Sequence, residues 1–186
     1  MSFLRVFPEN NSSHFEEFKE HYQIAHRLQE IAVRFERWTA AHELPANATQ
    51  EEILSAYDHS LQRIMKEVGF VTADVISVHS ATPNIVDLRK KFLDEHTHTE
   101  DEARFFVDGS GLFYIHVNSK VYVLLCEKGD FIDIPANTRH WFDMGPKPTL
   151  KAIRTFNRQE GWVANFTGSD IASHFPRFED LIALPV

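Results

Sequence analysis

Three histidines and one glutamate stand at spacings that could form a metal site. His96 and His98 are two residues apart, Glu102 follows four residues later, and His140 lies much further along the chain. Residues two apart on a β-strand project to the same face, so His96 and His98 can bind one ion together. Neutral imidazole and carboxylate suit a divalent ion such as Fe(II), Ni(II), Mn(II) or Zn(II). Four such ligands on an octahedral ion leave adjacent positions open for a bidentate substrate.

Two arginines could stabilise an anion bound beside such an ion. Arg104 comes two residues after Glu102, so on a strand both side chains point into the same cavity. Arg154 lies in the segment LKAIRTF, where Ile153 and Thr155 would face the other way. Arginine keeps its charge when buried, so either residue could serve in such a cavity. The alternative interpretation of each arginine is a surface residue or one that forms a salt bridge. The remaining histidines are interpreted as helix-face or loop residues: His14, His21, His26, His42, His59, His79, His116 and His174.

Size and composition limit the class of protein. A chain of 186 residues predicts one domain, over residues 1–186. Its 27 acidic and 19 basic residues give a net charge of −8, which disfavours binding to nucleic acid or to an anionic membrane. The single cysteine excludes an internal disulfide and a cysteine-based zinc site. No apolar stretch has the length of a signal peptide or a spanning helix, so we expect a cytoplasmic protein. No distinct interface pattern stands out, so we expect a monomer.

Helical periodicity dominates the first part of the chain. An S-x-x-E capping box at Ser13 predicts a helix that runs to about Ala40, with apolar residues at three- and four-residue steps. A second capping box at Thr49 predicts another helix, and Gly69 is a plausible end for it. We therefore expect residues 1–70 to be mostly helical.

Short strands are predicted after this point. Residues 71–78 are rich in β-branched residues and read as a strand, and residues 83–93 could form one more short helix. From Arg104 onward, six short apolar segments alternate with turns, which is typical of an antiparallel sandwich or barrel. The predicted fold is mainly β: an antiparallel β-barrel over residues 71–170, an N-terminal helical layer, and a C-terminal tail over residues 171–186.

The order of the candidate ligands resembles both halves of the cupin motif, a metal-binding double-stranded β-barrel. H-x-H-x3-E leads to Gly109, and a later G-x5-P-x4-H segment ends at His140. Three positions depart from the usual cupin pattern. Asn137 and Lys90 stand where cupins usually have Gly, and Met144 stands where the second half often ends in Asn. All four ligands of the motif are nevertheless present.

Longer segments resemble the acireductone dioxygenase family of methionine salvage. They are KFLDEHTHTEDEARFFVDGSGLFYIH, PANTRHWFDMG and IRTFNRQEGWVANF. The resemblance implies one Fe(II) or Ni(II) per chain, held by His96, His98, Glu102 and His140. It also implies that 1,2-dihydroxy-5-(methylthio)pent-1-en-3-one, the acireductone, reacts with O2. The Fe(II) form would give 4-methylthio-2-oxobutanoate and formate, and the Ni(II) form 3-methylthiopropanoate, formate and carbon monoxide.

The same resemblance implies roles for residues beside the ligands. Arg104 would help to generate the substrate dianion, Glu95 would act in metal loading, and Asp101 would transmit a conformational change. The alternative for Glu95 and Asp101 is ligand orientation or plain solvent exposure. An apolar pocket is needed for the methylthio tail, and aromatic–sulfur contacts are mildly favourable. Aromatic residues near the motifs are therefore candidates for it, although an aromatic residue in a strand usually belongs to the core: Phe92, Phe142, Phe156 and Trp162.

Other functions are compatible with the same fold. A different cupin oxygenase or a sugar-phosphate isomerase would use the same ligands, but an isomerase needs a cluster of Lys and Arg for phosphate, and only scattered candidates are present. A non-catalytic binder of small molecules has no need for the complete ligand set. The sequence does not test a partner-binding role for the N-terminal helices, because packing on the barrel explains their apolar stripes.

Overall fold

The structure is a computed structural model that describes residues 1–45, 47–157 and 162–182. Residues 158–161 of the segment IRTFNRQEGWVANF and residues 183–186 of the predicted tail lie outside the described residues. In the described part, eleven strands join one sheet. They are β1 (Phe3–Pro8), β2 (Glu16–Phe18), β3 (Arg34–Arg37), β4 (Thr72–His79), β5 (His96–Thr97), β6 (Glu102–Val117), β7 (Lys120–Glu127), β8 (Asp130–Ile134), β9 (Arg139–Asp143), β10 (Thr149–Phe156) and β11 (Asn165–Phe166).

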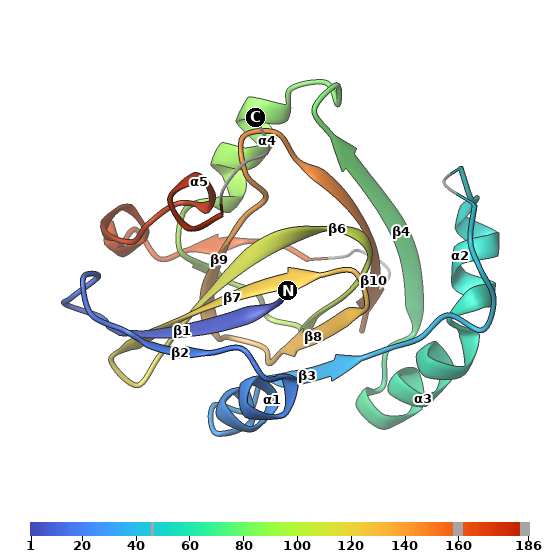
Figure 1. Ribbon diagram of the computed structural model, residues 1–186, viewed down its shortest axis with the longest axis horizontal. Coiled ribbons are helices and arrows are strands. Elements are labelled where there is room, and N and C mark those ends of the chain that lie inside the picture. Colours follow the sequence, from blue (N-terminus) through green and yellow to red (C-terminus); the bar gives the residue numbers. More distant parts are fainter. Residues whose placement is uncertain (46, 158–161, 183–186) are drawn as a thin grey trace.

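The long strand β6 joins two half-sheets into a barrel (Figure 1). Its first half pairs with β8 and β10, and its second half, from Ser110, pairs with β7 and β9. The turn signal at Asp108-Gly109 predicts two separate strands, but β6 continues through this residue. Gly109 has a φ of 74°, and a Cβ there would lie 1.5 Å from the backbone oxygen of Thr149. Only glycine therefore allows the strand to pass from one half-sheet to the other.

Helices lie outside the barrel and at its ends. They are α1 (His21–Gln29), α2 (Gln50–Ala56), α3 (Asp58–Val68), α4 (Ile85–Phe92), α5 (Phe178–Leu181) and the short 3-10 helix η1 (Ile171–His174). Figure 1 shows α2 and α3 beside β4, with α4 and α5 on another side of the barrel. Among the described residues, none of the helices has the length and apolar character needed to cross a membrane.

Apolar side chains form three packed layers. The inner layer lies between the two half-sheets and contains Phe113 of β6. A second layer packs Phe105, on the outer face of β6, with residues such as Ile64 of α3. A third layer packs Trp141 of β9 with Phe175, next to η1. Because helices or the C-terminal segment cover the outer faces, strand residues on both faces are buried.

The N-terminal prediction is wrong in extent. In place of a helix from Ser13 to Ala40, α1 is nine residues long and is flanked by β2 and β3. Glu16, the expected capping partner of Ser13, lies in β2 and pairs with Val6 of β1. Residues 1–70 thus supply three strands to the sheet, because pairing with distant strands outweighs the local helical pattern.

Other local predictions are confirmed. Thr49 forms the capping box with Glu52, and Gly69 ends α3 with a φ of 86°. The single predicted helix is divided at Tyr57, which has non-helical backbone angles and separates α2 from α3. The predicted strand over residues 71–78 is β4, and the predicted short helix within residues 83–93 is α4.

Candidate metal centre

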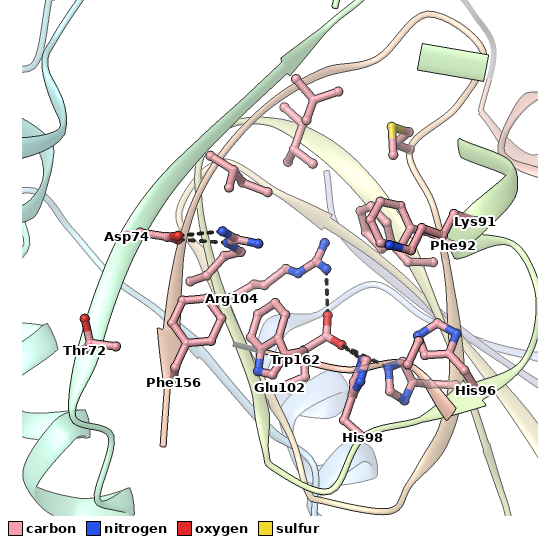
Figure 2. A pocket seen from close by; sticks show the side chains of 18 residues that line it. Thr72, Asp74, Lys91, Phe92, His96, His98, Glu102, Arg104, Phe156 and Trp162 are labelled. Atoms are coloured by element: carbon pink, nitrogen blue, oxygen red, sulfur yellow. Dashed lines mark hydrogen bonds and ion pairs between the residues drawn. The ribbon is translucent and has the colours of Figure 1, made fainter. Parts of the chain in front are cut away.

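The structure brings His96, His98, Glu102 and His140 together (Figure 2). His96 lies in β5 opposite His140 in β9, His98 follows β5, and Glu102 begins β6. One ligand atom from each residue lies within 4.8 Å of the others, and all four side chains are buried. Residues from separate strands thus form one compact set of N and O donors.

Hydrogen bonds fix which imidazole nitrogen faces the centre. In each of the three histidines, Nδ1 lies 2.8 Å from a backbone oxygen. The acceptor is the backbone oxygen of Asp94 for His96, of Val163 for His98 and of Thr138 for His140. A carbonyl oxygen only accepts, so each Nδ1 carries a hydrogen, and in the neutral ring each Nε2 presents its lone pair to the centre.

The position of Glu102 shows that the centre fits a cation. Its Oε2 lies 3.0 Å from the Nε2 atoms of both His98 and His140. Two lone-pair atoms repel each other at this distance unless a proton or a metal ion also contacts them. Ligand atoms that lie about 2.1 Å from one ion, at right angles to each other, are about 3.0 Å apart. The donor types and their spacing therefore suit a divalent metal.

Burial and charge act on these ligands together. Burial alone would raise the pKa of Glu102, but the positive charge of Arg104 and hydrogen bonds from His140 and His98 hold it well below its usual range. Burial and then the neighbouring His140 lower the pKa of His96 to about 4. For His98, burial is outweighed by the hydrogen bond to Glu102, which raises its pKa. Glu102 and His96 are thus held in their metal-binding forms at neutral pH.

Arg104 lies directly beside the ligands. Its Nη2 donates to Oε1 of Glu102 at 2.9 Å, and its guanidinium carbon lies 4.8 Å from the centre of the Phe142 ring. The side chain is buried, and its Nε has no hydrogen-bond partner in the described part of the chain. Because the guanidinium also lines the cavity, its positive charge is available to an anion bound there.

A cavity of about 430 Å³ opens next to the four ligands. Arg104, Arg154 and all four predicted aromatic residues line it, whereas Ile153 points away into the layer with α2 and α3. Asp74 holds Arg154 by two contacts, Nε to Oδ1 at 2.8 Å and Nη2 to Oδ2 at 2.5 Å (Figure 2). Arg154 therefore both lines the cavity and forms an ion pair. The aromatic lining residues are Phe92, Phe142, Phe156 and Trp162.

Aliphatic residues that the sequence analysis did not select line the other end of this cavity. They are Ile76, Val78, Met144 and Leu150. Strand register sets their distance from the charged end. Leu150 of β10 pairs with Val78 of β4. Arg154 lies four residues further along β10, about 13 Å from Leu150, and pairs with Asp74 and with Arg104. One pattern in the sequence could have predicted the aliphatic end. Alternate residues of a strand share a face, and here they are Thr72, Asp74, Ile76 and Val78.

Glu95 and Asp101 do not line the cavity in the described structure. Oε1 of Glu95 lies 2.6 Å from Nδ1 of His116, and Oε2 accepts a hydrogen bond from Thr167 at 2.7 Å. Oδ1 of Asp101 accepts a hydrogen bond from the backbone of Ala136 at 2.8 Å. Both side chains thus hold neighbouring segments and do not contact the cavity. Their implied roles, in metal loading for Glu95 and in conformational change for Asp101, stay predictions.

The interpretation of His116 as a helix-face or loop residue is wrong. His116 lies in β6, is 5% exposed, and contacts carboxylates of both Glu95 and Glu9. Its place in the alternating segment GLFYIHV indicates a strand, but the spacing does not reveal the two carboxylates. They come from residues distant in the sequence and are brought there by the fold.

The turn that precedes His140 explains one departure from the cupin pattern. Asn137 has a φ of 62°, in the left-handed region where glycine is usual. Asparagine tolerates this conformation better than most other residues. Its backbone N–H donates to the oxygen of His98 at 2.7 Å, so the turn is bonded to a metal-ligand segment despite the substitution.

Comparisons with known proteins agree with this site. A model of the ARD/ARD' family matches residues 4–164. The acireductone dioxygenase of Pseudomonas aeruginosa (strain UCBPP-PA14) is 52% identical over 181 residues, which is 97% of this chain and 100% of that protein. That of Hydrogenobaculum sp. (strain Y04AAS1) is 52% identical over 184 residues, which is 99% of this chain and 100% of that protein.

A solved structure confirms the predicted fold class. It is an acireductone dioxygenase from Bacillus anthracis with a cadmium ion in its active centre. The TM-score is 0.78 at 29% identity, over 89% of this chain and 98% of that chain. The family match, the near-complete coverage and the shared fold lead to one conclusion: the chain belongs to the ARD/ARD' family.

Proposed function

We propose that this protein is a cytoplasmic, monomeric acireductone dioxygenase of methionine salvage. Its substrates would be O2 and 1,2-dihydroxy-5-(methylthio)pent-1-en-3-one, and it would hold one Fe(II) or Ni(II) ion. The observation that carries the proposal is the position of Arg104. Its buried guanidinium lines a cavity that also contains three histidines and a glutamate with metal-ligand spacing.

His96, His98, Glu102 and His140 would hold the metal through three Nε2 atoms and Oε2 of the carboxylate. When bound, a divalent metal would lower the pKa of the substrate hydroxyls and support reaction with O2. Arg104 would stabilise the resulting anion with its fixed positive charge. Its ion pair with Oε1 of Glu102 keeps the guanidinium beside the ligands.

The remainder of the cavity supports the proposed substrate. The aromatic rings of Phe142 and Trp162 flank Arg104 and exclude water from its charge. Since Asp74 neutralises Arg154, this ion pair adds no net charge to the cavity wall. The aliphatic end, which includes Ile76, suits the uncharged methylthio tail.

The two metals would direct the same substrate to different products. With Fe(II), the products would be 4-methylthio-2-oxobutanoate and formate. With Ni(II), they would be 3-methylthiopropanoate, formate and carbon monoxide. Both sets account for all atoms of the acireductone and one O2. The ligand types do not select between the metals, because both accept imidazole and carboxylate.

The decisive experiment reconstitutes apo-protein separately with Fe(II) and Ni(II), supplies acireductone and O2, and identifies the carbon products. We expect the 2-oxo acid from the Fe(II) form and carbon monoxide from the Ni(II) form. A Glu102→Gln protein treated identically measures the uncatalysed background. O2 uptake at the background rate in both forms would overturn the proposal and favour a cupin isomerase or a binding protein.

A further inference from the structure

A chain of three polar side chains, two of them buried, lies beside β5 and does not line the cavity. Nδ1 of His116 is 2.6 Å from Oε1 of Glu95, and Nε2 of His116 is 2.9 Å from Oε2 of Glu9. Glu95 is 1% exposed and His116 is 5% exposed. Both ring nitrogens of His116 thus contact a carboxyl oxygen, and the ring bridges the two acidic side chains.

This chain ties three separate segments together. Glu9 follows β1, His116 lies near the end of β6, and Glu95 directly precedes β5. The other oxygen of Glu95 accepts a hydrogen bond from Oγ1 of Thr167 at 2.7 Å, and its backbone oxygen accepts one from the N–H of Thr167 at 3.1 Å. Both oxygens of the Glu95 side chain are therefore partnered, so its position is strongly determined.

The strand β5 has few other means of support. It contains two residues, of which His96 pairs with His140 of β9 and with Phe166 of β11. A strand of this length has little backbone pairing of its own, and it must still hold His96 and His98 at ligand spacing. Side-chain contacts from Glu95, the residue immediately before His96, supply the missing support.

We propose that His116 is a positioning residue for the metal centre. Through Glu95, and with Glu9 on its other side, it holds β5 where His96 and His98 can bind the same ion as His140. The residue touches neither the ligands nor the cavity, so its effect is on metal affinity. The proposal requires that the centre binds a metal and does not depend on which reaction follows.

The test measures Ni²⁺ binding to apo-protein by calorimetry, without substrate. Residues that orient metal ligands typically affect metal affinity by about 10- to 100-fold. We therefore expect His116→Gln to raise the Kd for Ni²⁺ by about 10-fold or more. Glu9→Gln, which leaves the contact between His116 and Glu95, should raise it by a smaller factor. His79→Gln, an exposed histidine at the end of β4, is the matched control and should leave the Kd unchanged.

Urea unfolding of each apo-protein separates positioning from general stability. A lower unfolding midpoint together with an unchanged Ni²⁺ Kd would show that His116 is only structural and would overturn the proposal. If His116→Gln does not fold, Glu9→Gln decides, because the Glu9 side chain is 41% exposed and can be replaced without a buried cavity. A folded Glu9→Gln protein with the wild-type Kd would then reject the inference.

Discussion

The two ends of the cavity are built from the same sheet in opposite ways. At the metal end, the three imidazoles are oriented by backbone oxygens, and the carboxylate of Glu102 is held by Arg104. At the aliphatic end, Ile76, Val78 and Leu150 present only hydrocarbon from paired strands. Polar groups must be satisfied individually, while apolar groups need only fill space. We therefore expect single changes to matter far more at the metal end.

The largest effect should come from Glu102→Gln. The amide cannot supply the negative charge that offsets a divalent ion, and its NH2 group would face the Nε2 atoms of two histidines or the ion. Activity should fall by about 1,000-fold or more, and bound metal should be lost. Metal content by mass spectrometry, together with O2 uptake, measures both. Glu51→Gln on exposed α2 is the control. Full metal content with full activity would show that the metal end is not the reaction centre.

The two arginines sharpen the comparison, because they pair in register but differ in burial. Arg104 is buried against Glu102, whereas the side chain of Arg154 is 29% exposed and neutralised by Asp74. We expect Arg104→Met to lower kcat by about 100-fold while metal content is retained. Arg154→Met should cost less than about 10-fold, as for a partly exposed ion pair. Equal losses in kcat would contradict the distinction drawn here.

A smaller effect is expected at the aliphatic end. Ile76→Ala removes hydrocarbon from the cavity, so KM should rise by about 10-fold while kcat changes little. Val75→Ala is the matched control, because Val75 is adjacent on β4 but packs with the outer layer. Steady-state kinetics on the reconstituted enzyme measures both. An unchanged KM for Ile76→Ala would place the substrate tail elsewhere and remove the functional difference between the ends.

The smallest effect on the reaction, and a distinct effect on stability, is expected for Asp133→Asn. Burial and then the negative charge of Asp101 raise the pKa of Asp133 to about 7, from an ordinary value of 3.8. The folded protein thus binds a proton more tightly than the unfolded chain. This stabilisation is fully present below about pH 4 and is lost as the pH rises through about 7. The raised pKa reflects the unfavourable free energy of holding an ionised Asp133 in a buried position close to Asp101.

Asparagine at position 133 carries no such penalty. The free energy of unfolding of Asp133→Asn relative to wild type should therefore increase between pH 5 and pH 8, by about 2 kcal/mol. Urea unfolding at both pH values measures this difference, and Asp108→Asn, an exposed position on β6, is the control. A difference independent of pH would show that Asp133 is ionised in the folded protein throughout this range.

Some of the fold followed from local patterns and some did not. The capping box at Thr49, the end of α3 at Gly69 and strand β4 depend on neighbouring residues and were predicted. The strand β2 was missed because its apolar spacing also fits a helix, and only pairing with β1 decides between them. The continuity of β6 through Gly109 was missed because a glycine after aspartate usually indicates a turn.

The sequence by itself determined the chemistry of the centre. The residue types of His96, His98, Glu102 and His140, and their spacing on strands, specify N and O donors for a divalent metal. Tertiary structure alone decided what surrounds these donors: the backbone acceptors of the imidazoles, the aliphatic end at Ile76, and the carboxylates around His116. The physical reason is that side-chain spacing along one strand is a local property. Neighbours across strands depend on register between segments far apart in the chain.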